Sequence, residues 1–277
     1  MEESINEWLA ALPLGAGVTF VQSDRNGLIA LNKPAGVRSH PNNDGADPGA
    51  LLVVDYESEA EAYHWRDANG KLRKLYLLNR LDAPTSGLIL LAANPECAEA
   101  VRSAFKDHTV EKTYLARVFG NPHPPKGRWD DRLRTQRTRE GLRSQLGSGP
   151  PARTRYQTLA SAANNHLVTN LLALHPETGR THQLRVQCQG HGVPIVGDQT
   201  YGDFVRNRQF FSTADISARL LLHAWRIRVP YTLKGERFTF AAEAVPPALL
   251  QPLGGTSPES SSAEPPQLKT RRFKRPG

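Results

Sequence analysis

Asp82 is a carboxylate between two apolar runs, a position where charge is uncommon. Leucines precede it at 77–78, residues 88–92 form an apolar run after it, and Pro, Thr, Ser and Gly bend the chain over residues 84–87. Apolar runs bounded by turn residues are typical of buried strands. We therefore expect Asp82 in a turn where two core strands end. There it either accepts backbone hydrogen bonds or acts as a nucleophile or base.

Tyr114 and Arg185 are the residues most able to assist such a carboxylate. Tyr114 lies in residues 110–119, where charged and apolar side chains alternate as in a half-buried strand. Arg185 is expected on a short helix that opens near Thr181. An arginine can hold a buried carboxylate ionised through paired hydrogen bonds, which fits a structural ion pair. It also fits a carboxylate that attacks a sugar C1' or deprotonates C2', whereas ordinary glycoside hydrolysis needs a second acid.

Several other chemistries lack their sequence motifs. The chain has no GxxxxGK[ST] phosphate loop, no GxGxxG after a strand, no HExxH and no GxSxG. Its nine histidines form no ligand cluster, and Cys97 and Cys188 are far apart without CxxC spacing. We therefore expect no metal site and no disulfide, with both cysteines as buried thiols. His223, beside a tryptophan on an apolar strand, is expected to be a core histidine.

The charge of the chain favours a polyanionic partner. The formal net charge is +8, and residues 117–155 hold ten Lys or Arg against three acids. Residues 120–151 are rich in Pro, Gly, Arg and Thr without sustained periodicity, which predicts a long mobile loop that could serve as a nucleic-acid arm. No apolar run approaches a membrane span, and the N-terminus is acidic where a secretory signal would be basic. We expect a cytoplasmic protein with no membrane partner.

The remaining pattern predicts one catalytic domain with short extensions. Residues 1–22 are an N-terminal extension with a short possible helix, residues 23–250 form the domain, and residues 251–277 are a disordered linker and basic tail. The expected elements, in chain order, are a strand from 27 ending at a Lys-Pro-x-Gly turn, a helix at 95–107, a hairpin of 154–159 with 167–174 turning at 162–165, and closing strands at 220–229 and 238–242.

Four motifs in a fixed order resemble the RluA family of RNA pseudouridine synthases. They are Leu31-Asn32-Lys33-Pro34-Ala35-Gly36, Arg80-Leu81-Asp82-x-x-Thr85-Ser86-Gly87-Leu88, Lys112-Thr113-Tyr114-Leu115-Ala116, and Thr178-Gly179-Arg180-Thr181-His182-Gln183-Leu184-Arg185, which is followed by Pro194-Ile195-Val196-Gly197-Asp198. A single Arg-Leu-Asp step is a weak signal. The ordered set spans roughly residues 28–242 and is highly specific.

The resemblance implies an α+β fold: a bent mixed, mostly antiparallel sheet flanked by helices, with a central cleft that takes RNA. It implies isomerisation of uridine to pseudouridine in ribosomal or transfer RNA, with no metal, nucleotide or organic cofactor. A monomer is expected. The main alternative is a catalytically silent RNA-binding protein on the same scaffold, and a nucleoside hydrolase or glycosylase is a more distant one.

The resemblance also implies roles for single residues. Asp82 matches the catalytic aspartate, Tyr114 the aromatic residue that stacks on the target base and assists removal of the C5 proton, and Arg185 the basic partner of the aspartate. Six further residues are expected to bind substrate: Arg80, which holds the RNA as the uridine flips out, Leu184, which lines the pocket, and Lys33, Thr85, Arg180 and His182. The chain departs from the family pattern at Asn79 and Gln187, where His is usual, so its target preference could differ.

Overall fold

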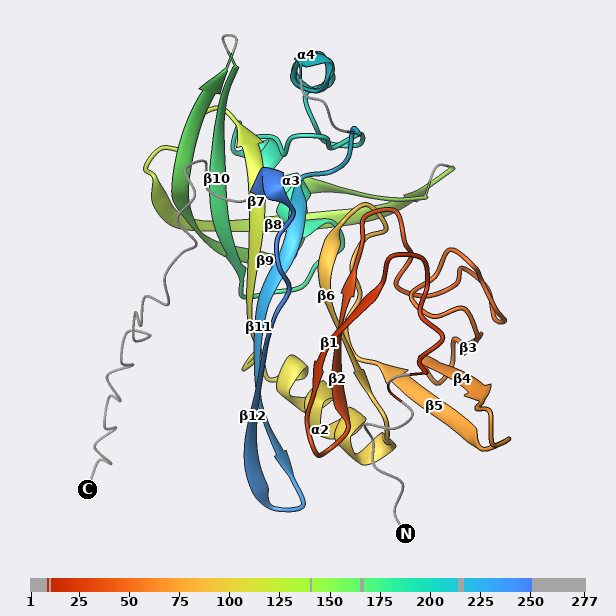
Figure 1. Cartoon of the computed structure of the whole chain (residues 1–277). Helices are drawn as coiled ribbons and strands as arrows, with labels where there is room; N and C mark the ends of the chain where they lie inside the picture. Colours follow the sequence, from red (N-terminus) through yellow and green to blue (C-terminus); the bar gives the residue numbers. More distant parts are fainter. Residues whose placement is uncertain (1–8, 10, 140, 165–166, 214–216, 251–277) are drawn as a thin grey trace, which may run out of the picture.

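The protein is described by a computed structural model, which covers residues 9, 11–139, 141–164, 167–213 and 217–250. Its core is one 12-stranded sheet with helices against it (Figure 1). The strands are β1 Thr19–Ser23, β2 Leu28–Lys33, β3 Asp55–Glu57, β4 Ala62–Arg66, β5 Leu72–Leu77, β6 Ser86–Ala92, β7 Glu111–Phe119, β8 Lys126–Thr138, β9 Gly141–Asn164, β10 Leu167–Pro176, β11 Leu222–Leu233 and β12 Glu236–Glu243. The helices are α2 Pro95–Lys106, α3 Gln183–Gly190, α4 Phe204–Thr213 and the 3₁₀ turn η1 Ala248–Leu250.

The sheet is mixed and mostly antiparallel, as predicted. Its order is β3-β4-β5-β6-β11-β7-β10-β9-β8. In addition, β2 pairs with β6, β1 pairs with β2, and β12 pairs with β11. Among the strands named above, all pairings are antiparallel except that of β6 with β11, which covers His223↔Ser86 and Ala224↔Gly87. This short parallel contact joins an N-terminal half-sheet to a C-terminal one, and the two halves diverge from it (Figure 1).

Gly87 permits the close contact at this junction. Its φ is +115°, and a Cβ at this position would lie 2.3 Å from the backbone oxygen and 2.5 Å from the backbone nitrogen of Ala224. Only glycine combines that backbone conformation with such a close approach. The glycine of the predicted bend therefore lets β11 pair directly beside the turn that carries Asp82.

The N-terminal half-sheet is buried on both faces. Helix α2 covers one face, where Leu28 and Leu90 pack with Val101. Ile29 and Leu91 pack on the other face with Leu51, Leu52 and Tyr63. Every residue of β6 is buried, which explains its continuous apolar run. The predicted helix is confirmed as α2, with Asn94 as its N-cap and a proline in its first turn.

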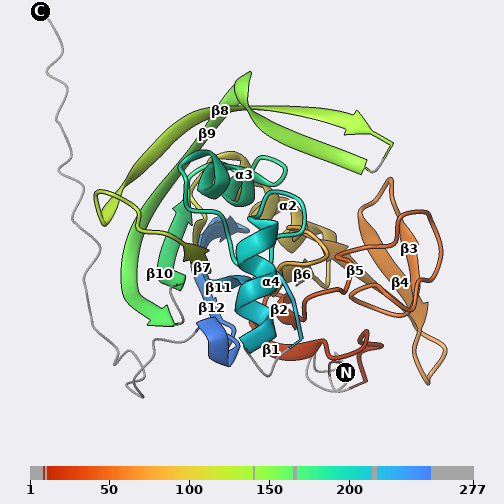
Figure 2. The same ribbon diagram turned by 90° about the horizontal axis from the view of Figure 1, so that it is seen from above.

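The arginine-rich segment is structured, so the predicted mobile loop is wrong. Strands β8 and β9 form a long antiparallel hairpin that arches over α3 (Figure 2). Trp129, Leu133 and Ala152 are buried beneath it, whereas Arg132 and Arg134 are exposed. Most residues of the hairpin are exposed and polar, and two of its leucines, Leu142 and Leu146, are exposed as well. The few buried positions therefore give no regular apolar alternation in the sequence.

Other predicted element boundaries differ from those of the structure by a few residues. The predicted hairpin is β9–β10, but β9 runs to Asn164 and so takes in most of the predicted turn. Strand pairing continues across the boundary predicted at residue 22, because β1 begins at Thr19. Helix α4 was not predicted. The possible helix at the N-terminus and the basic tail lie largely or wholly outside the described residues.

Candidate active site

A cavity of about 790 Å³ opens where the two half-sheets meet. Most of its lining comes from the β5–β6 turn, β7, the loop before α3 and α3 itself, and Leu142 of the hairpin also lines it. Eight of the nine sequence-predicted site residues line it: Arg80, Asp82, Thr85, Tyr114, Arg180, His182, Leu184 and Arg185. Residues separated by about a hundred positions in the chain are thus brought to one cleft.

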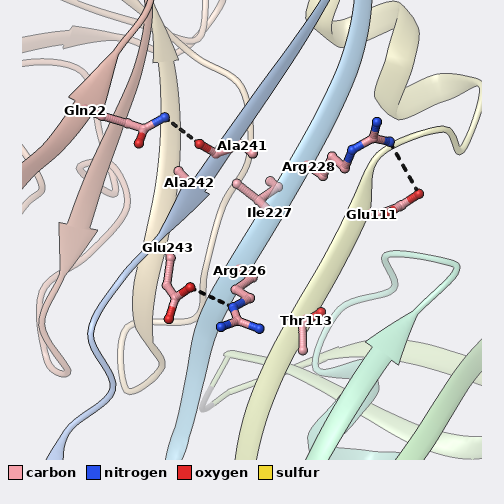
Figure 3. Close-up of a pocket in the computed structure, with 9 residues that line it drawn as sticks. All are labelled: Gln22, Glu111, Thr113, Arg226, Ile227, Arg228, Ala241, Ala242 and Glu243. Carbon is pink, nitrogen blue, oxygen red and sulfur yellow. Dashed lines mark hydrogen bonds and ion pairs between the residues drawn. The ribbon is translucent and has the colours of Figure 1, made fainter. Parts of the chain in front are cut away.

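A second hollow, of about 440 Å³, lies over β7, β11 and β12 (Figure 3). Its four charged residues neutralise one another in pairs. Arg226 is 2.7 Å from Glu243, and Arg228 is 3.7 Å from Glu111. The cleft beside Asp82 differs because a carboxylate, an arginine, a histidine and a tyrosine converge there. We therefore assign the candidate active site to the cleft.

The turn that carries Asp82 is held by hydrogen bonds on both sides of it. The Ser39 hydroxyl donates to the Leu81 carbonyl at 2.7 Å and accepts from the Leu81 amide at 2.9 Å. The Thr85 amide donates to the Asp82 carbonyl at 2.9 Å. Ser39 and Thr85 are buried. The main chain of Asp82 is thereby fixed before any ligand binds, as a catalytic carboxylate requires.

Lys33 holds the same turn from below instead of lining the cleft. Its ammonium donates to the carbonyls of Pro34, Val37 and Ala83 at 3.0, 2.7 and 3.0 Å, and its side chain is fully buried. Burial lowers the pKa of Lys33 to about 7, although the Asp82 charge opposes this. All three protons of the ammonium face backbone carbonyls. The predicted substrate-binding role is therefore corrected to a structural one, because no donor is left for RNA.

Arg185 joins two carboxylates. Its Nη1 donates to Asp82 Oδ2 at 3.0 Å, while Nε and Nη2 donate to the two oxygens of Asp198 at 2.8 Å each. Asp198 is 1% exposed, and although burial alone would raise its pKa, the bonds from Arg185 and from the amides of Tyr201 and Thr200 hold that pKa below its usual value. The paired bonds to Asp198 fix the guanidinium plane, so the remaining Nη1 is aimed at Asp82.

Tyr114 presents a neutral phenol to the cleft. Burial, and secondarily the Asp82 charge, raise its pKa well above the usual range for tyrosine. It lies on β7 opposite Leu174 of β10 and Ala224 of β11, and it packs against the apolar residues on both sides. A neutral, half-buried ring is suited to stacking on a planar base. Leu184 is buried and contributes a further apolar wall.

His182 lies beside the catalytic pair. Its backbone is left-handed, with φ 55°, at the start of α3. Its Nε2 is 3.8 Å from Asp82 Oδ2, and its Nδ1 is 2.8 Å from the Tyr201 hydroxyl. Burial lowers its pKa from the usual value, and Asp82 partly opposes this. The imidazole is therefore neutral at pH 7 and carries one proton.

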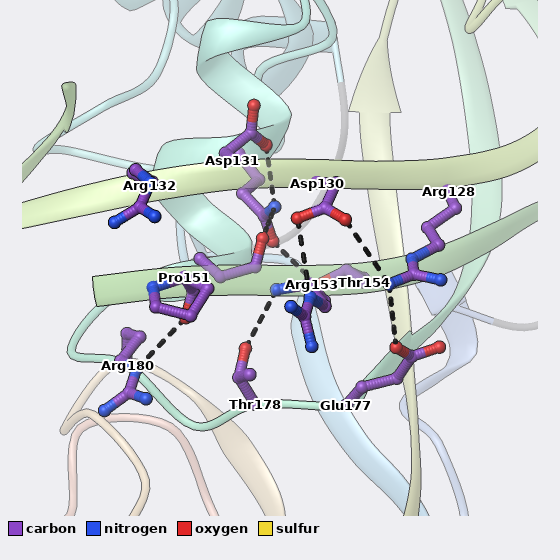
Figure 4. A network of polar contacts seen from close by, with 12 residues as sticks. Arg128, Asp130, Asp131, Arg132, Pro151, Arg153, Thr154, Glu177, Thr178 and Arg180 are labelled. Atoms are coloured by element: carbon purple, nitrogen blue, oxygen red, sulfur yellow. Dashed lines mark hydrogen bonds and ion pairs between the residues drawn. The ribbon is translucent and has the colours of Figure 1, made fainter. Parts of the chain in front are cut away.

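Arg80 and Arg180 lie at the rim of the cleft. Arg80 is exposed and 3.7 Å from the partly exposed Glu61, a weak ion pair that a phosphate can replace. The Arg180 Nε donates to the Pro151 carbonyl of the hairpin at 3.2 Å. The surrounding network ties the base of the hairpin to the loop before α3, where the Arg153 amide donates to Thr178 Oγ1 at 2.9 Å (Figure 4).

The sequence did not indicate the roles of Asp198 and Tyr201. Asp198 stood in a recognised motif without a function, and Tyr201 in no motif. One signal was available: a buried arginine needs more than one acceptor, and Asp198 is an acidic residue close after α3 in the chain. Among the described residues, no group of three or more His, Cys, Asp or Glu is placed to hold a metal ion. None of the helices in the described part is long and apolar enough to span a membrane.

Comparison with known proteins extends over most of the chain. Residues 27–190 match the RNA pseudouridylate synthase family. The chain is 31% identical over 223 residues to the RNA pseudouridine synthase YhcT of Bacillus subtilis (strain 168), covering 80% of this chain and 67% of that protein. It is 30% identical over 238 residues to the dual-specificity RNA pseudouridine synthase RluA of Escherichia coli (strain K12), covering 82% and 93%.

Solved structures are similar in fold as well. The human RNA pseudouridylate synthase domain containing 1 protein superposes with a TM-score of 0.59 at 25% identity, covering 81% of this chain and 82% of that one. The human domain containing 4 protein gives a TM-score of 0.58 at 24% identity, covering 88% and 93%.

Proposed function

We propose that Asp82 acts on the ribose of a flipped-out uridine in ribosomal or transfer RNA. The chain belongs to the RluA-type RNA pseudouridine synthases and is therefore an RNA-modifying isomerase. The observation that carries the proposal is the hydrogen bonding of the two oxygens of the Asp82 carboxylate. Arg185 engages Oδ2 at 3.0 Å, and no described residue hydrogen-bonds to Oδ1. One oxygen is thus anchored and the other is available to the substrate.

The reaction is chiefly a positioning problem. The C1'–N1 bond breaks, the uracil turns while it is held in the pocket, and a new C1'–C5 bond forms as the C5 proton leaves. A carboxylate can promote the first step by attacking C1' or by removing a proton from C2'. Because uracil is detached in between, the cleft must hold it against loss to solvent. Tyr114 and Leu184 supply flat and apolar walls for this purpose.

Tyr114 is proposed to stack on the uracil and to stay protonated until the base has turned. Its raised pKa argues against a standing phenolate. Removal of the C5 proton then requires the phenol oxygen to accept a proton as its own leaves, or requires a different base. The structure supports the stacking role more directly than the acid–base one, since the ring lines the cleft next to Asp82.

The arginines at the rim and on the hairpin are proposed to hold the flanking RNA. A stacked uridine has to be extruded from the RNA at a cost of a few kcal/mol, which phosphate contacts can offset. Arg80 and Arg180 stand at the cleft entrance. Arg132 and Arg134 extend the basic surface along the exposed face of the hairpin.

The test of this function has two parts. Pseudouridine is mapped in ribosomal and transfer RNA from cells with and without the gene, and the RNA that loses a site is then transcribed with a C5 tritium label. Release of the label without free uracil is the expected result. Free uracil would indicate a glycosylase, and binding without release would indicate a silent RNA-binding protein; either overturns the proposal.

A further inference from the structure

Tyr201 lies behind the active site and contacts Ser144 of the hairpin and three residues of the site, His182, Arg185 and Asp198. Its hydroxyl accepts a hydrogen bond from the Ser144 amide of the hairpin at 2.9 Å and is 2.8 Å from His182 Nδ1. Its ring lies under the guanidinium of Arg185, whose Cζ is 5.1 Å from the ring centre. Its amide donates to Asp198 Oδ1 at 3.0 Å. Tyr201 therefore links the hairpin to both partners of Asp82.

The direction of each hydrogen bond follows from a count of protons. A phenol has one proton and two lone pairs, and an amide can only donate. The Ser144 amide therefore occupies one lone pair of the Tyr201 oxygen. The phenol proton is left for His182 Nδ1, because no other described group hydrogen-bonds to this hydroxyl. His182 Nδ1 then accepts, and the single imidazole proton resides on Nε2.

The opposite arrangement is electrostatically worse. If Nδ1 carried the proton, the phenol oxygen would accept from both Ser144 and His182, and its own proton would have no partner. The lone pair of Nε2 would then face the Asp82 carboxylate at 3.8 Å. With the proton on Nε2, an N–H dipole faces that carboxylate instead.

We propose that Tyr201 is a positioning residue that fixes the tautomer of His182, so that the imidazole presents its Nε2–H to Oδ2 of Asp82. The inference rests on the proposed role of Asp82. Arg185 and His182 then both face Oδ2, which leaves the lone pairs of Oδ1 free for the substrate. The 3.8 Å separation is longer than a hydrogen bond, and catalytic hydrogen bonds are often this long before substrate binds.

The charged groups around His182 do not set the tautomer by themselves. Asp82 and Asp198 favour the protonated ring, whereas Arg185, Arg143 and burial favour the neutral one. The net result is a neutral imidazole, for which the hydrogen-bond partner 2.8 Å from Nδ1 distinguishes the two nitrogens more strongly than the Asp82 carboxylate 3.8 Å from Nε2. Tyr201 is that partner, and Asp198 anchors Tyr201 through its amide while anchoring Arg185 through its guanidinium. One short segment thus orients both groups that face Asp82.

The experiment combines ¹⁵N-histidine NMR of the free protein with steady-state kinetics. His182 is assigned by loss of its signal in His182→Gln. In the wild type, Nδ1 is expected to be unprotonated and Nε2 protonated. Tyr201→Phe keeps the ring over Arg185 and removes only the hydroxyl, so it is expected to give a tautomer mixture and a kcat lower by about tenfold or more, with KM little changed.

A double-mutant comparison separates positioning from a structural effect. In a His182→Gln background, where no tautomer exists, Tyr201→Phe is expected to have little further effect on kcat. The matched control is Tyr156→Phe, which removes a hydroxyl that donates to the Pro124 carbonyl at the base of the same hairpin. That variant is expected to leave the His182 signals and kcat unchanged.

The outcomes that overturn the inference are distinct from those that overturn the proposed function. A wild-type His182 protonated on Nδ1, or an equal loss of kcat from Tyr201→Phe in both backgrounds, refutes the positioning role while pseudouridine formation stands. A wild type that makes no pseudouridine refutes the proposed function, and the NMR result is read independently of it.

Discussion

Two carboxylates bind Arg185, and replacing each by asparagine should have opposite effects on stability and activity. Asp82 has a side chain that is 27% exposed, and it receives one hydrogen bond from the arginine. Asp82→Asn keeps an oxygen for Nη1 and removes a charge that is partly solvated. We expect the free energy of unfolding to change by no more than about 1 kcal/mol.

Asp198 should behave differently because it is buried at 1% exposure and accepts four hydrogen bonds: two from Arg185 and one each from the Thr200 and Tyr201 amides. In Asp198→Asn, an NH₂ group replaces one acceptor oxygen and the guanidinium is left buried with an incomplete partner. Breaking a buried ion pair in this way costs about 3–5 kcal/mol. Stability is measured for both variants by chemical denaturation.

The effects on activity should have the opposite order: Asp82→Asn should reduce activity more than Asp198→Asn does. Asp82→Asn is expected to lower pseudouridine formation at least about a thousandfold, with RNA affinity nearly intact, whereas Asp198→Asn should lose activity only as far as Arg185 is displaced. Tritium release from labelled RNA is measured on samples shown to be folded. If Asp82→Asn were destabilised as strongly as Asp198→Asn, or kept activity above that level, Asp82 would be a structural residue and the catalytic assignment would be wrong.

Three further predictions concern the frame of the site. Burial lowers the pKa of His223 to about 4, whereas in the unfolded chain this histidine takes up a proton near pH 6.5. The free energy of unfolding should therefore fall by about 3 kcal/mol between pH 6.5 and 4. Denaturation series at each pH measure this loss, which His223→Gln should remove. Gly87→Ala should cost about 2–5 kcal/mol because its Cβ meets the Ala224 backbone, whereas the control Gly70→Ala, with nothing within 4 Å, should cost only the backbone strain; equal losses would refute the close-approach argument. Replacing Arg132 and Arg134 by Gln should make the plot of log RNA affinity against log salt concentration less steep, by about 0.7–0.9 per lost phosphate contact. An unchanged slope, or an equal change in the control Arg25→Gln, would exclude the hairpin as an RNA contact.

The sequence alone identified the elements whose residues pack locally. The α2 helix and β7 were predicted because their apolar residues recur at regular spacing over one buried face. The turn at Asp82 was predicted because punctuating residues interrupt two apolar runs. Such signals depend on neighbours within a few residues, so they survive in the one-dimensional pattern.

The hairpin shows where that pattern fails. Its inner residues Trp129 and Leu133 are buried in clusters that include residues of α3, some fifty residues later in the chain. The outer face is arginine-rich because it is exposed, and composition therefore indicated a loop. Periodicity could not supply the partner that makes this ribbon a strand pair.

The sequence by itself determined which residue could act as the carboxylate, which arginine could pair with it and which tyrosine could meet a base. Only the tertiary structure decided how they are held. Lys33 became a buried support for the turn, and Asp198 and Tyr201 became the groups that orient Arg185 and His182. The physical reason is that residue type and spacing fix what a side chain can do. Burial and long-range hydrogen bonds fix which of its atoms remain free to do it.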